Sequence, residues 1–280
     1  MVVVQFIGER HGFMIDIIVI GGGPAGLSAA ISARQRNRNV AVITNDMAHS
    51  ALHKAREIGN YPGLPKISGP ELLGKLTSHA AEAGADLVIG RVYTVLPSAG
   101  LFNVGYGNEI LVSKTVVIAT GLAQTSVFPG EEKFLGNSVS YCATCDGMFF
   151  RGKRVCVVCL TPEASNEAEY LASIGCDVVR VDRQDIRING EQRLTSVTAG
   201  GEEIPCDGVF ILRQAVAPHL LVANLVTEDG FITVGASGET NIPGIFAAGD
   251  CVGTPHQIAK AVGQGQVAAL AADVFLGVRD

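Results

Sequence analysis

A strand, a glycine-rich turn and a helix follow one another near the start of the chain, and this succession constrains the fold most. Residues 15–20 (IDIIVI) form an apolar, β-branched run of the kind that is buried on both faces in a parallel sheet. The run leads directly into GGGPAG at residues 21–26, and a helical pattern follows over residues 27–36. A G-x-G-x-x-G motif in this setting is a dinucleotide-binding fingerprint, so we predict a doubly wound, three-layer Rossmann-like α/β domain.

The glycines of this turn each have a physical reason. Gly21 permits the tight bend, Gly23 lets the backbone approach a pyrophosphate, and Gly26 lets the helix pack close to the strand. The helix N-terminus then holds the phosphates. The predicted cradle comprises Gly21, Gly22, Gly23, Pro24, Ala25 and Gly26.

Further residues that are predicted to contact the same dinucleotide follow later in the chain. Asn45 and Asp46 follow the glycines by about 20 residues, where either suits a ribose hydroxyl. The long loop at residues 49–65 is predicted to cover the cofactor ring. After it we expect a helix over residues 70–83 with Ser68 as its cap, a strand over 86–89, and short antiparallel strands over 92–113. Two further strands end in cofactor-facing residues, namely Ala119, Thr120 and Gly121 in one and Gly249 and Asp250 in the other.

The motif CATCDG at residues 142–147 points to redox chemistry. Cys142 and Cys145 can close into a small disulfide ring, and thiolates are the attacking species in disulfide exchange. Asp146 lies next to the second sulfur, where it can move the proton of each exchange. The alternative is a zinc site shared with the C-x-x-C at Cys156 and Cys159. Residues three apart on a strand point to opposite faces, which argues against that site, so no metal is predicted.

Composition narrows the functional class. The chain has 280 residues, 48% hydrophobic content, 34 glycines and a formal charge of −6, with a pI near 5.5. This balance argues against nucleic acid or an anionic membrane as a partner. Seven cysteines point to a reducing, cytoplasmic setting in which Cys156, Cys176 and Cys206 are buried small hydrophobes. Residues 1–13 suit no signal peptide and extend past the expected domain edge, with Met14 as an alternative start.

Three stretches together carry a family resemblance: GGGPAG, CATCDG, and TNIPGIFAAGD followed by HQIAKAVGQG. With them the chain resembles the low-molecular-weight thioredoxin reductases. The resemblance implies a homodimer with a discontinuous FAD domain (residues 1–121 and 240–280) and an inserted, smaller Rossmann-like domain (122–239). It implies that Cys145 exchanges electrons with the flavin and that Cys142 attacks a protein disulfide. It places the FAD near Asn60, Gly249, Asp250, His256, Gln257 and Ile258, with histidine at 256 where the family usually has arginine.

The predicted insert departs from the family where NADPH would bind. The family's second G-x-G-x-x-A reads CLTPEA at residues 159–164, so Cys159 and Thr161 place side chains where a phosphate would touch backbone, and Glu163 adds like charge. The family also has a His-Arg-Arg cluster that binds the 2′-phosphate of NADPH, and this chain has Asp182-Arg183-Gln184 in its place. Residues 185–203 are too few for the family's further helix and strand. We therefore expect a trimmed domain that does not use NADPH.

The leading hypothesis is an FAD-dependent reductase of thioredoxin or a similar protein disulfide. Relatives that lack the NADPH motifs take electrons from ferredoxin, so ferredoxin is the favoured donor. Seven basic residues of the insert offer a docking face for such an acidic protein, although charges of this kind are often only solvated: Arg151, Lys153, Arg154, Arg180, Arg183, Arg187 and Arg193. The alternatives are a second flavin near the C-x-x-C, a disulfide-forming oxidase, and a non-catalytic flavin-bound redox sensor or scaffold.

Overall fold

The chain divides into two compact units. The structure is a computed structural model that describes residues 14–45, 47, 50, 52–122, 128–141, 143–160, 164–181, 185–212 and 218–277, without the side chains of Thr144, Cys145 and His219. The larger unit takes in residues 1–123 and 217–280, and the smaller one residues 124–216. The expected start at Met14 concerns residues 1–13, which lie outside the described part.

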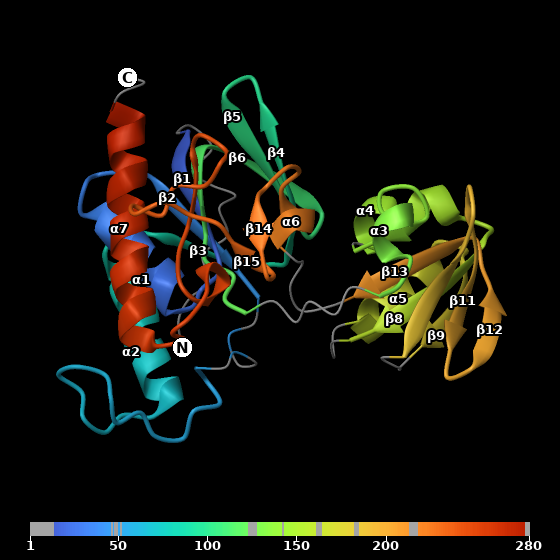
Figure 1. Cartoon of the computed structure of the whole chain (residues 1–280), viewed down its shortest axis with the longest axis horizontal. Helices are drawn as coiled ribbons and strands as arrows, with labels where there is room; N and C mark the ends of the chain where they lie inside the picture. Colours follow the sequence, from blue (N-terminus) through green and yellow to red (C-terminus); the bar gives the residue numbers. More distant parts are fainter. Residues whose placement is uncertain are drawn as a thin grey trace. The chain divides into compact units, whose positions relative to one another are not determined.

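A seven-stranded sheet forms the centre of the larger unit (Figure 1). Its order is β3 (Asp86–Ile89), β2 (Val40–Thr44), β1 (Ile15–Ile20), β6 (Glu109–Ile118), β5 (Leu101–Tyr106) and β4 (Val92–Ser98), and β16 (Ile245–Ala247) also pairs with β6. The strands β3, β2, β1, β6 and β16 run parallel. This arrangement confirms the prediction of a Rossmann-like α/β fold with a parallel sheet.

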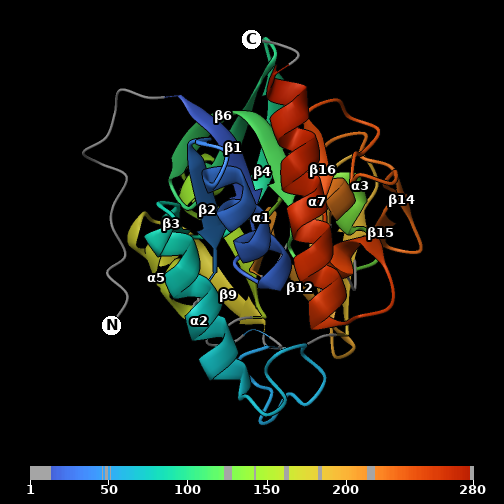
Figure 2. The same cartoon turned by 90° about the vertical axis from the view of Figure 1, so that its left-hand side faces the viewer.

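Three helices cover one face of this sheet (Figure 2). They are α1 (Pro24–Arg34), α2 (Gly69–Glu82) and α7 (Ile258–Gly277), and α1 packs along α7 and against α2. Alternation along the strands explains the core, because Ile17, Val19 and Val42 are fully buried on the helix side. The helix α1 begins at Pro24, three residues before the predicted start, since proline suits the first helical turn. Ser68 caps α2 as predicted, with its hydroxyl accepting from Glu71 N at 3.3 Å.

One strand, β6, joins two kinds of pairing. Its first half pairs antiparallel with β5, and its second half runs parallel to β1 and β16. The prediction of two separate strands, one ending near Ser113 and one beginning at Thr115, is therefore wrong. No glycine or proline interrupts this stretch, and two buried hydroxyls bind backbone here: Ser113 Oγ donates to Thr115 O (2.8 Å), and Thr115 Oγ1 donates to Asp16 O (2.9 Å).

Residues 217–239 belong to the larger unit, whereas the predicted boundary was at 239/240. The short helix α6 (Pro218–Leu221) packs on β4, and Val222 forms a bridge to Val95. The hairpin of β14 (Thr227–Glu228) and β15 (Phe231–Ile232) follows, and Ile232 is 2% exposed. Burial of these apolar residues brings the chain back to the larger unit earlier than the motifs indicated.

The smaller unit contains a parallel sheet of its own. Its order is β7 (Val139–Ser140), β13 (Gly208–Leu212), β8 (Arg154–Cys159) and β9 (Asp177–Val181), and α5 (Ala164–Ser173) connects β8 to β9. A three-stranded antiparallel sheet follows β9, made of β10 (Ile186–Gly190), β11 (Leu194–Ala199) and β12 (Glu202–Pro205). Strands, rather than a helix and a strand, therefore occupy most of residues 185–203.

Candidate functional site

The glycine turn after β1 has the geometry that the motif predicts. Gly21 has φ +114°, and a Cβ there would lie 2.2 Å from the carbonyl oxygen of Ala119. A Cβ on Gly26 would lie 1.9 Å from Gly21 O, so both positions exclude any larger residue. A Cβ on Gly23, by contrast, would meet nothing within 4 Å. The turn is closed toward the protein and open at Gly23, where the pyrophosphate is predicted to touch backbone.

The end of β6 reaches this turn and carries a buried polar atom. Ala119 N donates to Ile20 O at 2.8 Å, which places Ala119, Thr120 and Gly121 beside the end of β1. The Thr120 hydroxyl is buried beside the Cys251 thiol. It forms no hydrogen bond of standard geometry with any described residue. Burial raises the pKa of Cys251 to about 11, so this thiol is neutral at pH 7. The open glycine turn beside this hydroxyl fits a bound dinucleotide such as FAD.

Of the two predicted ribose ligands, Asn45 follows β2 directly, and the residue before it, Thr44, lies against Gly22. Thr44 Oγ1 donates to Asn45 O at 3.1 Å, and a Cβ on Gly22 would come within 2.7 Å of the same hydroxyl. The other predicted ligand, Asp46, lies outside the described residues.

Two side chains of α7 hold the loop that follows β16, and the sequence analysis missed both. Gly249 has φ +89° and precedes Asp250, which begins the short helix η4 (Asp250–Val252). Gln264 Oε1 accepts from Gly249 N at 3.1 Å, and Lys260 Nζ donates to Gly249 O at 3.2 Å and also to Gly253 O. The spacing of Lys260 and Gln264, four residues apart on one helical face, was a usable signal.

The loop between β2 and α2 meets the start of α7. Asn60 Nδ2 donates to Gln257 Oε1 at 2.8 Å, so two residues predicted to lie near the flavin are in contact. His256 precedes Gln257, and its ring lies 6.0 Å from that of Phe231. Ile258 is the first residue of α7. The structure therefore brings Asn60, His256, Gln257 and Ile258 together at the amino end of α7, where the helix dipole favours negative charge.

The redox motif lies between β7 and β8 of the smaller unit. Ala143 to Asp146 form α4, and Gly147 to Phe150 form η3, whereas Cys142 lies outside the described residues and the Cys145 side chain is not described. Asp146 Oδ2 accepts from Ser140 Oγ at 2.7 Å. This bond fixes the carboxylate that is predicted to move the proton of disulfide exchange.

Two further carboxylates surround the motif, and neither was predicted from the sequence. Glu167 of α5 accepts from the backbone N of Ala143, the residue after Cys142, at 3.2 Å. Glu131 is fully buried and accepts from Tyr141 OH at 2.6 Å and from Phe128 N at 2.8 Å. Glu167 lies 24 residues from Ala143 and Glu131 lies 10 residues from Tyr141, so no local pattern signals these two contacts. These bonds anchor the backbone on both sides of Cys142.

A cavity of about 300 Å³ opens beside the motif. Its walls include the Ser140 and Asp146 pair and two aromatic side chains, and the residues that line it are Gly136, Asn137, Val139, Ser140, Asp146, Phe149 and Phe150. Met148 and Phe149 are 55% and 74% exposed. The motif is therefore flanked by exposed apolar side chains, a feature of docking surfaces.

The other cysteines behave as predicted. Cys156, Cys176 and Cys206 are buried, which confirms that prediction. Cys156 and Cys159 both lie on β8, but Cys159 packs on the α5 side of the sheet, whereas Cys156 is fully buried and lies beside Cys206. The two sulfurs of this C-x-x-C thus face different neighbours, and the described residues contain no group of three or more metal-ligating side chains.

The second nucleotide cradle is the segment at residues 159–164 that corresponds to the family's NADPH motif, and the structure describes only part of it. Cys159 ends β8 at the position of the family's first glycine, and the β8–α5–β9 unit around it is formed. Residues 161–163 and 182–184, on which the remaining departures fall, lie outside the described part of the chain.

Comparisons with known proteins agree with these motifs. The family described as "Pyridine nucleotide-disulphide oxidoreductase" matches residues 15–187 and 185–265. A "Thioredoxin reductase" of Listeria innocua is 31% identical over 291 residues, which cover 90% of this chain and 91% of that protein. The crystal structure of a ferredoxin-flavin thioredoxin reductase from Clostridium acetobutylicum has a TM-score of 0.85 and 34% identity, covering 95% of this chain and 98% of the other. The structure of a thioredoxin reductase from Gloeobacter violaceus has a TM-score of 0.77 and 30% identity, covering 96% of each chain. Within the described residues, no helix is long and apolar enough to cross a membrane.

Proposed function

The chain belongs to the pyridine nucleotide-disulphide oxidoreductase family as a flavin-dependent enzyme of thioredoxin reductase type, and we propose that ferredoxin, not NADPH, is its electron donor. Electrons pass through FAD to the Cys142–Cys145 pair and then to thioredoxin or a similar protein disulfide. We place this reaction in the cytoplasm, because seven cysteines in a chain of this length suit a reducing compartment.

The choice of donor rests on the residues at the end of β8 and directly after it. Cys159 stands where a nucleotide-binding βαβ unit needs glycine, and the side chains of Thr161 and Glu163 follow it in the sequence. A β-carbon at these positions keeps backbone N–H groups away from a pyrophosphate, and a carboxylate repels it. The name of the similar Clostridium acetobutylicum enzyme, a ferredoxin-flavin thioredoxin reductase, supports the same choice.

The residues of the larger unit would hold FAD and those of the smaller unit would handle the disulfide. When bound, FAD supplies the electron pair from its ring. Gly21 to Gly26 would bind the pyrophosphate, Thr120 would lie beside the cofactor, and the amino end of α7 would favour negative charge on the ring. The Cys142–Cys145 bond breaks as Cys145 takes up the electron pair, and two protons complete the dithiol.

The dithiol then reduces the protein substrate. The Cys142 thiolate attacks one sulfur of the substrate disulfide and forms a mixed disulfide, and Cys145 attacks Cys142 to release the substrate as a dithiol. Asp146, held by Ser140, accepts the proton that Cys145 loses. The exposed side chains of Met148 and Phe149 are suited to contact a protein substrate around its disulfide.

We also propose a homodimer, the assembly that the family resemblance implies. The outer face of α7 offers a suitable surface, because residues 261–272 contain no charged side chain and Val267 and Val274 are 41% and 67% exposed. Light scattering on the purified holoenzyme tests this proposal.

Anaerobic titration of the bound flavin tests the donor. We expect reduced ferredoxin to bleach the flavin within the turnover time and NADPH to leave it oxidised, because the second cradle does not bind a pyrophosphate. Faster bleaching by stoichiometric NADPH would contradict the proposal.

The same preparation tests the alternative of a second bound flavin. The cavity beside Asp146 and Phe149 is the observation that favours this alternative. If a second flavin binds, denatured protein releases two flavins per chain.

A further inference from the structure

We propose that the loop at residues 52–67 is the docking surface for an acidic electron-carrier protein. This inference rests on the proposed donor and assigns it a place on the chain. Three side chains carry the argument, Lys54, Arg56 and Lys66, and all three are exposed. We call these three residues the basic loop cluster.

The loop is positively charged in a negatively charged chain. Residues 52–67 contain Lys54, Arg56 and Lys66 against the single acidic residue Glu57, whereas the whole chain carries −6. None of the three basic side chains forms an ion pair with a described residue. Two basic residues of the smaller unit differ, since Arg154 pairs with Asp177 (3.5 Å) and Arg180 with Glu169 (3.6 Å). The charge of the loop is thus available to a partner.

The backbone of the loop has a defined conformation. Ile58 and Ile67 bridge each other with N–O distances of 2.8 and 3.3 Å, and both side chains are buried in the core of the larger unit. Gly69 N donates to Ala55 O at 2.8 Å, which closes the base of the loop. The antiparallel bridge sets Lys66 opposite Gly59, and the bond of Gly69 N to Ala55 O holds Lys54 and Arg56 at the base of the same loop. The three charges are therefore carried along one loop whose backbone is fixed, which lowers the entropy lost on binding.

The same loop reaches the predicted flavin edge. Its Asn60 binds Gln257 at 2.8 Å, immediately before α7 begins. A protein that docks on the basic loop cluster therefore lies against the segment that borders the ring. Positive charge beside a redox centre steers an acidic carrier and raises its association rate, and salt screens this effect. A nicotinamide dinucleotide needs a cradle rather than an exposed charged loop, so the surface fits a protein carrier.

The test compares two charge-reversal variants of the holoenzyme. One carries Lys54→Glu, Arg56→Glu and Lys66→Glu, and the matched control carries Lys153→Glu, Arg187→Glu and Arg193→Glu, three exposed residues of the smaller unit. Two readouts are taken: binding of an oxidised ferredoxin of net negative charge by calorimetry, and stopped-flow reduction of the flavin by the reduced ferredoxin. Flavin content and reduction by dithionite check that each variant holds the cofactor. A neutral version, Lys54→Gln, Arg56→Gln and Lys66→Gln, serves if the reversal disturbs folding.

We expect the loop variant to lose about tenfold or more in binding and reduction rate at about 20 mM ionic strength, and less than about twofold at about 0.5 M, because steering is screened. We expect the control to change less than about twofold. If ferredoxin reduces both variants and the wild type equally, or if only the control is slow, the docking proposal is overturned and the proposed donor stands. Loss of thioredoxin binding in the loop variant also overturns it. If NADPH, not ferredoxin, reduces the wild type, both proposals fall.

Discussion

Thr120 and Thr115 offer a matched test of the cofactor site at the scale of single residues. Thr115 lies within β6 and its Oγ1 donates to Asp16 O at 2.9 Å, whereas Thr120 follows β6 and its buried Oγ1 has no hydrogen bond of standard geometry to a described residue. We expect Thr120→Val to raise the stability of the apo protein by up to about 1 kcal/mol, since a buried unsatisfied group is removed. The same change weakens FAD binding about tenfold, because the cofactor loses a hydrogen bond.

The matched control is Thr115→Val, which should destabilise the apo protein by about 1–3 kcal/mol and leave FAD affinity unchanged. Thermal unfolding of apo protein and fluorescence titration with FAD measure both quantities. Equal losses of apo stability in the two variants would mean that the Thr120 hydroxyl is already satisfied within the protein, and that it is no guide to the cofactor.

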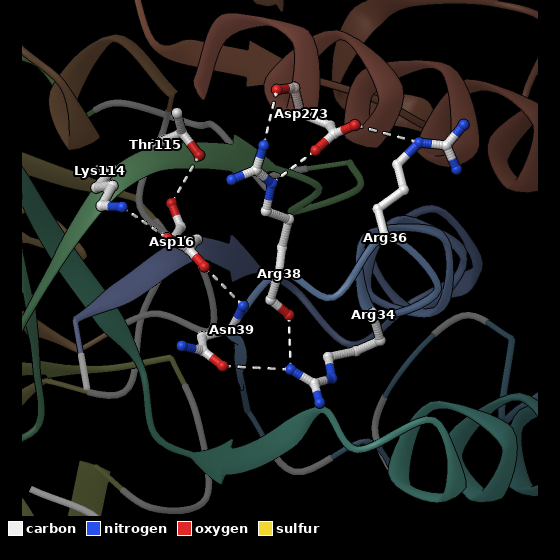
Figure 3. A network of polar contacts seen from close by, with 8 residues as sticks. All are labelled: Asp16, Arg34, Arg36, Arg38, Asn39, Lys114, Thr115 and Asp273. Carbon is white, nitrogen blue, oxygen red and sulfur yellow. Dashed lines mark hydrogen bonds and ion pairs between the residues drawn. The ribbon is translucent and has the colours of Figure 1, made fainter. Parts of the chain in front are cut away.

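At the scale of elements, a network of charged side chains fastens the far end of α7 to the turn between α1 and β2. Figure 3 shows Asp273 of α7 between two arginines: Arg38 Nε lies 2.6 Å from Oδ1, and Arg36 Nε lies 3.3 Å from Oδ2. Arg34 at the end of α1 also stabilises this turn, because its Nη1 donates to Arg38 O at 2.6 Å (Figure 3). Its Nε donates to Ala83 O at 3.2 Å. In the same region Asp16 accepts from Asn39 N and pairs with Lys114.

We expect Asp273→Ala to lower the free energy of unfolding by about 1–2 kcal/mol, because Arg38 and Asp273 are only 21% and 24% exposed and the loss leaves two guanidinium groups facing each other. The control is Glu71→Ala, which removes an ion pair with Lys75 at 58% exposure and should cost less than about 0.5 kcal/mol. Urea unfolding at low and high salt measures both. An effect of Asp273→Ala no larger than that of the control would show that packing, not charge, fixes α7.

Some of the helices, strands and turns could be predicted from the sequence and others could not. The turn after β1, the cap at Ser68 and the strand bounds of β1 and β3 were predictable, because each depends on residues within one turn or one strand. The continuity of β6 was not, because a neighbouring strand on each side decides it. The contacts of Glu167 with Ala143 and of Asn60 with Gln257 join residues 24 and 197 positions apart. Such contacts follow from the assembled fold and leave no periodic signal in the chain.

At the scale of the whole molecule, the two proposals place the two half-reactions on different units and assign them different forces. The proposed donor surface is the charged loop of the larger unit, and the proposed substrate surface is the apolar pair Met148 and Phe149 of the smaller one. Charge steering weakens with salt, whereas apolar contact does not. The two half-reactions should therefore respond differently to the same change in ionic strength.

We expect Phe149→Ser to slow reduction of thioredoxin by the dithiol form about tenfold at any salt concentration, because it removes a large exposed apolar contact, and to leave flavin reduction by ferredoxin unchanged. The triple reversal at the basic loop cluster should do the opposite, and only at low salt. Single-turnover measurements of each half-reaction at two salt concentrations complete the comparison. If either variant slowed both half-reactions equally, the donor and the substrate would share one surface, and the separation of the two functions between the units would be wrong.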